Sequence, residues 1–462
     1  MTALFFLHCY VSKFLSVFLL VLSRFLIFAR FCHNCVEMKS LLKYSLVASF
    51  FFLSFSALFA QNITEKRGAS VDFLPAYYSH HIDSMVNLCI DHKILPGCQI
   101  MAVHSDSVVF SKNYGYLTYD SLDAVNDATV YDVASMTKPL ATTLAVMKLY
   151  DEHRLRLTDK LGQYLDYTSG TAVAELTLAE LLTHTSGLSA FVPFYREISG
   201  KNFWDTTVLH TVADDRFSLK VADNVFLRND YPDTLRYKIS IYHIGQKKYV
   251  YSDLGFFLLK EVVESVVQRP MEDYLADEFY RPMGLHRTGF HPLEFVKDGN
   301  IAPTEDDKYF RKQVLKGYVH DQTAALFGGN GGNAGLFSTA SEVSALLSML
   351  MHGGVYNGRT YLSEKTVRQF VSTCPMHGCQ RRGLGFDTPS FPAKSSVLPV
   401  QAGRRTYGHQ GFTGTVFWCD PDADLIYIFL SNRVYPDMEP NRLSQSRLRL
   451  LVHEEIYKAL GF

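Results

Sequence analysis

The chain contains the segment Val133-Ala134-Ser135-Met136-Thr137-Lys138-Pro139-Leu140. If this segment opens a helix, Ser135 and Lys138 lie on one face, one turn apart. A serine hydroxyl is a poor nucleophile at its own pKa, and a neighbouring amine can accept its proton. Pro139 suits a first helical turn, which tolerates proline. Because residues 140–150 are mostly apolar, we expect a buried helix with Ser135 at its N-terminus, where the helix dipole favours developing negative charge.

A serine three residues before a lysine is common by chance, so this pair needs support from the rest of the chain. Without it, Ser135 would be a helix cap and Lys138 a solvated charge of the first turn.

The composition is that of a globular protein. The chain has 462 residues, of which 47% are hydrophobic and 20% charged, with a formal net charge of -1. Residues 1–60 hold five basic residues and one acidic residue, so the remaining chain is mildly acidic. That balance argues against nucleic acid as a partner. We expect a small-molecule or peptide substrate, and the oligomeric state stays open.

The first 60 residues resemble a targeting segment. A short basic stretch begins at Met38, an apolar run covers 44–59, and Ala60 precedes Gln61, which is the order of a secretory signal. We therefore expect an exported, periplasmic or secreted protein with no stable membrane span after cleavage. The apolar stretch 5–31 is either an extra membrane segment or the product of a start codon placed upstream of Met38; the second account is simpler.

Five cysteines follow the presequence: Cys89, Cys98, Cys374, Cys379 and Cys419. Cys374 and Cys379 could close a small loop in an exported protein, but mostly free buried thiols are favoured. The spacing fits no zinc site, and no His-Glu-x-x-His motif occurs, so we expect neither metal nor cofactor.

Strands are expected near both ends of the chain and helices between them. The patterns predict helices over 76–94, 176–182, 254–267, 338–352 and 444–460, and hairpins formed by 98–103 with 108–112 and by 416–419 with 425–430. Thr177 and Glu180 stand in capping-box register. Segment 203–249 is expected to be irregular, 295–325 an exposed loop and 374–404 a surface insertion. The glycine run 328–335 lacks a phosphate-loop ending, so we expect close backbone packing or a site edge there.

This order predicts an α/β (α+β) fold: an antiparallel sheet built from both chain ends, flanked by helices, with a mostly helical inserted subdomain. We place the presequence at 1–60 and a single domain at 61–462. Its α/β part covers about 61–135 and 325–462, and its helical part about 136–324.

Three further segments accompany Ser135-x-x-Lys138: Tyr251-Ser252-Asp253, His409-Gln410-Gly411 and 182–188, Leu-Thr-His-Thr-Ser-Gly-Leu. Together they make the chain resemble the serine β-lactamase and penicillin-binding-protein superfamily over roughly residues 75–460. It looks closest to the branch that holds class C β-lactamases, D-aminopeptidases, DD-carboxypeptidases and related esterases.

The resemblance implies a role for each matching residue. Ser135 would be the acylated nucleophile, Lys138 would hold or accept its proton, and Tyr251 would act with Lys138 as the general base. A phenol can do so only if nearby positive charge lowers its pKa, and Lys138 is the candidate. The N–H groups of Ser135 and Phe412 would form the oxyanion hole, and Gly411 would allow the edge strand to approach the substrate.

Two positions depart from the family pattern. Asp253 stands where asparagine is usual, and a carboxylate cannot donate to a substrate carbonyl. It could pair with Lys138 or be structural. His409 replaces the lysine of β-lactamases with a side chain that is mostly neutral at pH 7, which weakens binding of a substrate carboxylate. His409 could also simply bond to backbone. His184 and Ser186 do not form Gly-x-Ser-x-Gly, and we expect them to shape a turn near the site.

The sequence therefore favours an exported serine hydrolase that forms an acyl-enzyme on Ser135 with an ester, amide or peptide substrate. A true β-lactamase or DD-carboxypeptidase is an alternative within the same chemistry. A catalytically silent penicillin-binding or sensor module is an alternative of another class, and the intact Ser135, Lys138 and Tyr251 argue against it.

Overall fold

A six-stranded antiparallel sheet joins the two ends of the described chain. The computed structural model describes residues 70–389 and 397–462; the predicted signal sequence, with its expected start at Met38, lies outside them. The strands stand in the order β1-β3-β2-β17-β16-β15. Their bounds are β1 Val71–Asp72, β2 Gly97–His104, β3 Ser107–Gly115, β15 Tyr407–Gln410, β16 Val416–Asp420 and β17 Leu425–Ser431. The predicted antiparallel sheet from both chain ends is confirmed, with both expected hairpins in it.

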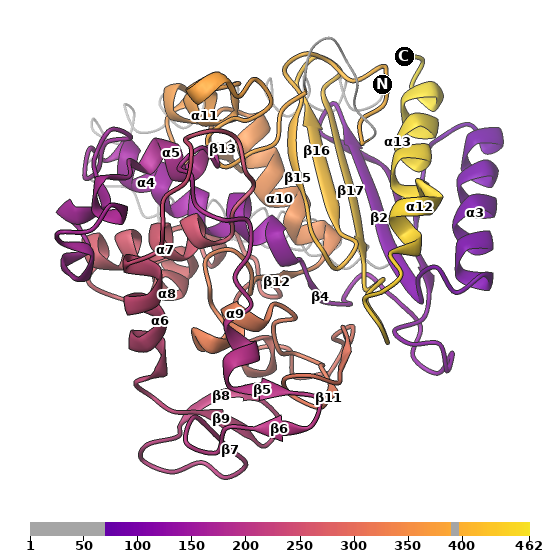
Figure 1. Ribbon diagram of the computed structural model, residues 1–462. Helices are drawn as coiled ribbons and strands as arrows, with labels where there is room; N and C mark the ends of the chain where they lie inside the picture. The colour runs from indigo at the N-terminus through magenta and orange to yellow at the C-terminus, as the bar shows by residue number, and fades with distance from the viewer. Residues whose placement is uncertain (1–69, 390–396) are drawn as a thin grey trace, which may run out of the picture. The chain divides into compact units, whose positions relative to one another are not determined.

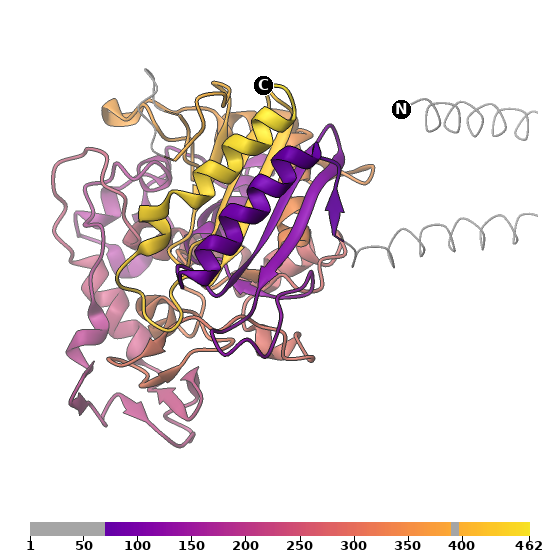
Figure 2. The same ribbon diagram turned by 90° about the vertical axis from the view of Figure 1, so that its right-hand side faces the viewer.

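Helices cover both faces of this sheet. Helices α3 (Ala76–Asp91) and α13 (Leu448–Ala459) pack together across one face, as Figure 2 shows, and α10 (Ala340–Met351) packs against β2 and β17 from the other. The periodicity that predicted α3 is explained by Ile82, Val86 and Cys89, which are buried and recur every three or four residues.

The remaining helices gather mostly beside the sheet, beyond the edge formed by β15 (Figure 1). They are α4 Leu144–Asp151, α5 Leu178–Leu182, α6 Tyr231–Ser240, α7 Leu254–Val267, α8 Met271–Leu275, α9 Gln322–Leu326, α11 Glu364–Val371 and, near the chain end, α12 Arg442–Ser446. The other strands are β4 Tyr131–Asp132, β5 Ser199–Gly200, β6 Phe203–Trp204, β7 Leu209–His210, β8 Leu219–Ala222, β9 Val225–Leu227, β10 Asp306–Asp307, β11 Gln313–Val314, β12 Phe337–Ser338, β13 Val355–Tyr356 and β14 Arg359–Thr360.

Several local predictions are confirmed because the side chains that predicted them make the expected contacts. Helix α7 has the predicted bounds. Thr177 and Glu180 bond reciprocally to each other's backbone N–H at the start of α5. The five cysteines after the presequence are free thiols. No helix in residues 70–389 and 397–462 is long and apolar enough to cross a membrane.

The segment 295–325 is not an exposed loop, which corrects the prediction. Asp307 and Arg311 are both buried and form an ion pair of 2.8 Å. The Asp307 carboxylate also accepts N–H groups of 309–311, and the Arg311 guanidinium donates to the carbonyls of Val319 and His320. Charged residues that satisfy one another can be buried, so polarity alone misplaced this segment.

Three other expectations need correction. Segment 203–249 contains a three-stranded sheet, β7-β9-β8, and α6 rather than irregular chain alone. Segment 374–404 is not all surface, because Arg382 and Phe386 are fully buried. The closing helix breaks at Arg447, whose left-handed φ of 57° separates α12 from α13.

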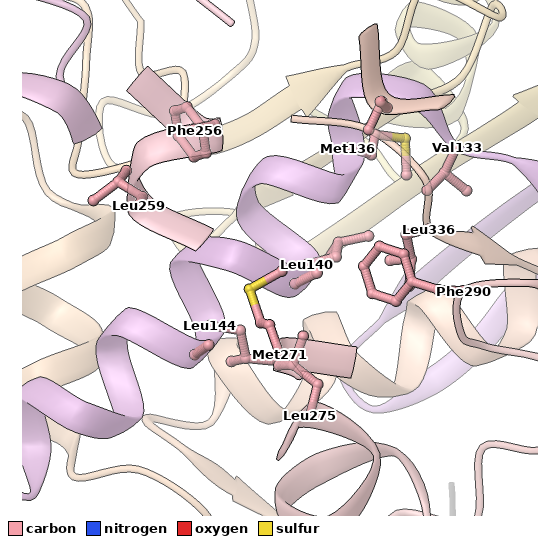
Figure 3. Close-up of a cluster of buried hydrophobic side chains, with 14 of the residues drawn as sticks. Val133, Met136, Leu140, Leu144, Phe256, Leu259, Met271, Leu275, Phe290 and Leu336 are labelled. Atoms are coloured by element: carbon pink, nitrogen blue, oxygen red, sulfur yellow. The ribbon is translucent and has the colours of Figure 1, made fainter. Parts of the chain in front are cut away.

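Two turns that differ from an α-helix precede α4 in the serine segment: the first is more tightly wound and the second more loosely wound. Ala134–Met136 forms a 3₁₀ turn, Lys138–Thr143 a π-helical turn, and α4 follows. Figure 3 shows Met136, Leu140 and Leu144 among the side chains of the larger hydrophobic core. This burial fixes the segment on which Ser135 stands.

The Asp307–Arg311 pair gives a test of the corrected segment. Asp307→Ala should lower the free energy of unfolding by about 3–5 kcal/mol, because it leaves a buried guanidinium uncompensated. Asp306→Ala is the matched control: its ion pair with Lys308 is more exposed, so its loss should cost about 0–1 kcal/mol. Urea denaturation measures both, and equal effects would contradict the buried pair.

Candidate active site

Ser135 and Lys138 form the centre of the site. Lys138 Nζ donates to Ser135 Oγ over 2.9 Å, to Asp253 Oδ1 over 2.7 Å and to the Asn333 carbonyl oxygen over 3.2 Å. The lysine side chain is fully buried, whereas Ser135 is partly exposed. All three N–H bonds of the ammonium therefore have acceptors, and one of them is the predicted nucleophile.

Asp253 directly precedes α7, yet its side chain caps no N–H of that helix. The carboxylate turns to Lys138 instead and keeps 19% of its side chain exposed. Of the two interpretations of Asp253, the structure thus favours the site-lining one.

The charge of Asp253 sets the resting protonation state of Lys138. Burial lowers the pKa of Lys138, but the Asp253 carboxylate and the neighbouring Tyr251 hydroxyl raise it, and the net pKa lies above the ordinary lysine value. Lys138 is therefore an ammonium ion in the resting site.

Tyr251 packs beside this ammonium. Lys138 Nζ lies 4.8 Å from the centre of the Tyr251 ring. Burial raises the pKa of Tyr251, the charge of Lys138 lowers it and the charge of Asp253 raises it; the net pKa is above the ordinary value. Lys138 thus lowers the pKa of Tyr251 as expected, but burial and Asp253 outweigh it in the resting site.

Two neutral histidines support Tyr251. The His184 ring centre lies 4.4 Å from that of Tyr251, and the His409 ring centre 6.0 Å. The Ser252 N–H donates to His184 Nδ1 (3.0 Å), which ties the tyrosine loop to the turn at His184. Burial lowers the pKa of His184 well below its ordinary value and that of His409 to about 3. Neither histidine supplies positive charge at neutral pH.

The predicted oxyanion-hole segment is bonded to the chain that leads into Ser135. Thr415 Oγ1 donates to the Val133 carbonyl (3.0 Å), and Thr413 Oγ1 donates to the carbonyl of Asp132 (2.7 Å). A Cβ atom at Gly411 would lie 2.5 Å from the Val133 oxygen, so the close approach that this glycine permits is to the serine segment.

The side chain of Phe412, the other predicted oxyanion-hole residue, is held between two partners. The Arg433 guanidinium lies 4.5 Å from the centre of the Phe412 ring, and the His320 ring stacks at 5.6 Å. Arg433 Nε also donates to the Phe412 carbonyl (2.9 Å). These contacts hold the side chain and the carbonyl of Phe412, while the hydrogen bonds of Thr413 and Thr415 hold the same turn against the Ser135 segment.

Sequence reasoning missed three groups around the site. Asn333 contributes a carbonyl from the glycine run, where the glycines were the only signal. Arg382 and Asp387 form an ion pair whose charges act on His409, and Asp387 pairs through its backbone with Gly408 at the edge of the sheet. Nothing in the sequence of segment 374–404 distinguished Arg382 and Asp387 from the exposed residues that a surface insertion would contain.

Comparison with known proteins identifies the family of the chain. The family model described as Beta-lactamase matches residues 82–451. The chain belongs to the β-lactamase family. It is a serine hydrolase of that family, as the recognised motifs implied.

Relatives and solved structures extend the comparison. A protein of Escherichia coli O157:H7, provisionally named a D-alanyl-D-alanine carboxypeptidase, is 27% identical over 432 residues, covering 86% of this chain and 92% of its own. A class C β-lactamase structure has a TM-score of 0.59 at 15% identity, covering 84% of this chain and 97% of its own. A hydrolase with promiscuous acyltransferase activity has a TM-score of 0.58 at 17% identity, covering 82% and 98%. At these identities the two structures show the fold alone.

Within residues 70–389 and 397–462, no three His, Cys, Asp or Glu side chains are placed to share a metal ion.

The Asp253 charge gives a pH-dependent test. Since Asp253 raises the pKa of both Lys138 and Tyr251, the deprotonated form of this pair appears only at high pH. We expect labelling of Ser135 by a fluorophosphonate to become faster towards alkaline pH, and Asp253→Asn to move the midpoint of that rise to lower pH. Asp424→Asn, in the turn between β16 and β17, is the matched control and should leave the midpoint unchanged. An unmoved midpoint in Asp253→Asn would contradict this account.

Proposed function

We propose that the chain is an exported serine hydrolase that forms an acyl-enzyme on Ser135 with an ester, amide or peptide substrate. The observation that carries the proposal is the hydrogen bond from the buried Lys138 ammonium to Ser135 Oγ, with Asp253 and Asn333 holding the same ammonium. A lysine that served only as a surface charge would not be buried against a serine hydroxyl.

The reaction proceeds in two halves. Once the Lys138–Tyr251 pair has lost one proton, it takes the proton of Ser135 as Oγ attacks the substrate carbonyl carbon. The pair returns this proton to the leaving alcohol or amine when the carbon–heteroatom bond breaks. A water molecule then gives a proton to the pair and attacks the ester, and Ser135 recovers its proton as the acid leaves.

Charge that develops on the carbonyl oxygen needs donors in place beforehand. The N–H groups of Ser135 and Phe412 are proposed for this role. This assignment is supported by two threonine hydrogen bonds, which hold residues 411–415 next to the segment before Ser135.

Export is proposed from the basic start at Met38, the apolar run and Ala60. Among the alternatives, DD-carboxypeptidase activity is favoured by the names of the curated relatives. His409 is neutral where a cation would bind a substrate carboxylate, which disfavours a true β-lactamase and also weakens binding of the C-terminal carboxylate of a DD-carboxypeptidase substrate. A silent sensor module is disfavoured by the intact contact between Lys138 and Ser135.

Intact-mass measurement after incubation with a fluorophosphonate or a labelled penicillin tests the proposal. We expect one adduct per chain, at Ser135, absent in Ser135→Ala and retained in Ser344→Ala on α10. With a substrate-like acyl donor the adduct should be transient, because water resolves it. No adduct at Ser135 would refute the nucleophile, and a permanent acyl adduct would favour the sensor module.

A further inference from the structure

Asp132 is a buried carboxylate to which the proposed reaction gives no part. It belongs to β4, shortly before Ser135, and is 2% exposed. Its Oδ1 accepts the Ala134 N–H over 2.8 Å, and its Oδ2 accepts the His320 N–H over 2.7 Å. Both donors are neutral backbone amides. Because burying a carboxylate is costly, these two bonds point to a geometric requirement at this place in the fold.

The first bond fixes the backbone immediately before the nucleophile. Ala134 has a left-handed φ of 48°, which alanine rarely adopts because its Cβ atom then crowds the following carbonyl oxygen. The Asp132 carboxylate holds this conformation through the Ala134 N–H. The Ser135 N–H lies in the peptide plane that follows Ala134, so the conformation of Ala134 sets its direction.

The second bond reaches the other donor of the proposed oxyanion hole. His320, whose N–H bonds to Asp132, stacks on the Phe412 ring with 5.6 Å between the ring centres. The Asp132 carbonyl also accepts the hydroxyl of Thr413, the residue after Phe412, over 2.7 Å. Asp132 therefore contacts groups that adjoin both proposed donors, the N–H of Ser135 and the N–H of Phe412.

The separation of these two N–H groups matters for the reaction. Both must donate to one oxygen atom, over about 2.7–3.1 Å each, when that oxygen becomes negative. A displacement of about 1 Å in such a site can lower the rate about 100-fold. A carboxyl group bonded on both sides of the hole can keep the two donors at a fixed separation.

The charge of Asp132 is not what would help the reaction. A negative charge close to the hole opposes a second one on the substrate oxygen. Positive charge beside the same turn comes from Arg433, whose Nε donates to the Phe412 carbonyl over 2.9 Å. The favourable contribution of Asp132 is therefore the position that it gives to the two donors.

We propose that Asp132 is the positioning residue of the oxyanion hole: it holds Ala134 in the left-handed conformation and fixes the Ser135 N–H relative to the Phe412 N–H. The inference rests on the proposed acyl-enzyme function. Asp132 itself neither touches the substrate nor moves a proton. Its loss should slow both halves of the reaction, because each passes through a tetrahedral oxyanion, and should leave binding of the unreacted substrate nearly unchanged.

Asp132→Asn tests this role with little change of shape. The amide keeps one acceptor oxygen and turns an NH2 donor towards the other backbone N–H, so one of the two bonds is lost. With p-nitrophenyl acetate we expect kcat and kcat/KM to fall together by about 10- to 100-fold, with KM changed less than about twofold. The affinity for phenylboronic acid, which forms a tetrahedral anionic adduct on a serine nucleophile, should fall by a similar factor.

Asp214→Asn is the matched control. Asp214 also accepts two backbone N–H groups, over 2.8 and 3.0 Å, but it does so on an exposed turn between β7 and β8. This variant should change none of the kinetic values. If p-nitrophenyl acetate is not hydrolysed by the native chain, the rate constant of Ser135 labelling by the fluorophosphonate replaces kcat/KM, since its phosphonyl oxygen enters the same hole.

A second substitution gives a rescue that a merely structural role would not produce. Asp132→Ala removes both acceptor oxygens, and glycine adopts a left-handed φ without the penalty of a Cβ atom. Adding Ala134→Gly to Asp132→Ala should therefore restore part of the lost rate. All rates are expressed per active site, counted by fluorophosphonate labelling carried to completion, so that poorer folding does not enter. If Asp132→Ala does not fold, Asp132→Asn decides alone.

The outcomes separate this proposal from the proposed function. If Ser135 of the native chain is not labelled, the proposed function itself fails. If Ser135 is labelled but Asp132→Asn keeps the native rate per active site, or changes KM alone, Asp132 is not the positioning residue. A slower reaction with unchanged boronic acid affinity, or a folded Asp132→Ala that Ala134→Gly does not rescue, also overturns the proposal.

Discussion

The buried ammonium of Lys138 is the interaction on which the site depends. A buried charge is costly unless it is paired and hydrogen-bonded, and each partner here comes from a different part of the chain. Ser135 belongs to the same helical segment, Asp253 precedes α7, and Asn333 belongs to the glycine run before α10. The hydrogen bonds of Lys138 therefore join the inserted helices to the serine segment. They also place the Ser135 hydroxyl beside the Lys138 amino group.

Lys138 also explains why aspartate in place of the usual asparagine at position 253 has a large effect on the charge of the site. An asparagine at this position would leave the charge of Lys138 available to lower the pKa of Tyr251. Asp253 offsets that charge, and the resting site consists of an ammonium, a neutral phenol and two neutral histidines. In the resting site the Lys138–Tyr251 pair, which is the proposed base, is therefore protonated.

Local sequence patterns predicted those parts of the fold that local interactions determine. Helix α7 and the hairpin of β2 and β3 followed from periodicity and turn residues, and the Thr177 cap followed from its partner three residues on. Segment 295–325 was misjudged because Asp307 and Arg311 look solvated until they are paired. Arg382 and the Asn333 carbonyl could not be predicted, because a long-range ion pair and a backbone oxygen leave no pattern in one sequence. The Ser135, Lys138 and Tyr251 roles came from their order along the chain, and the structure adds the contacts among them.

A crystal structure of the fluorophosphonate adduct would test the central claim most directly. The account predicts a covalent bond from Ser135 Oγ to phosphorus, with Lys138 still held by Asp253. One phosphonyl oxygen should lie within hydrogen-bonding distance of the N–H groups of Ser135 and Phe412. An adduct on another residue, or an adduct on Ser135 whose phosphonyl oxygen contacts neither N–H, would contradict it.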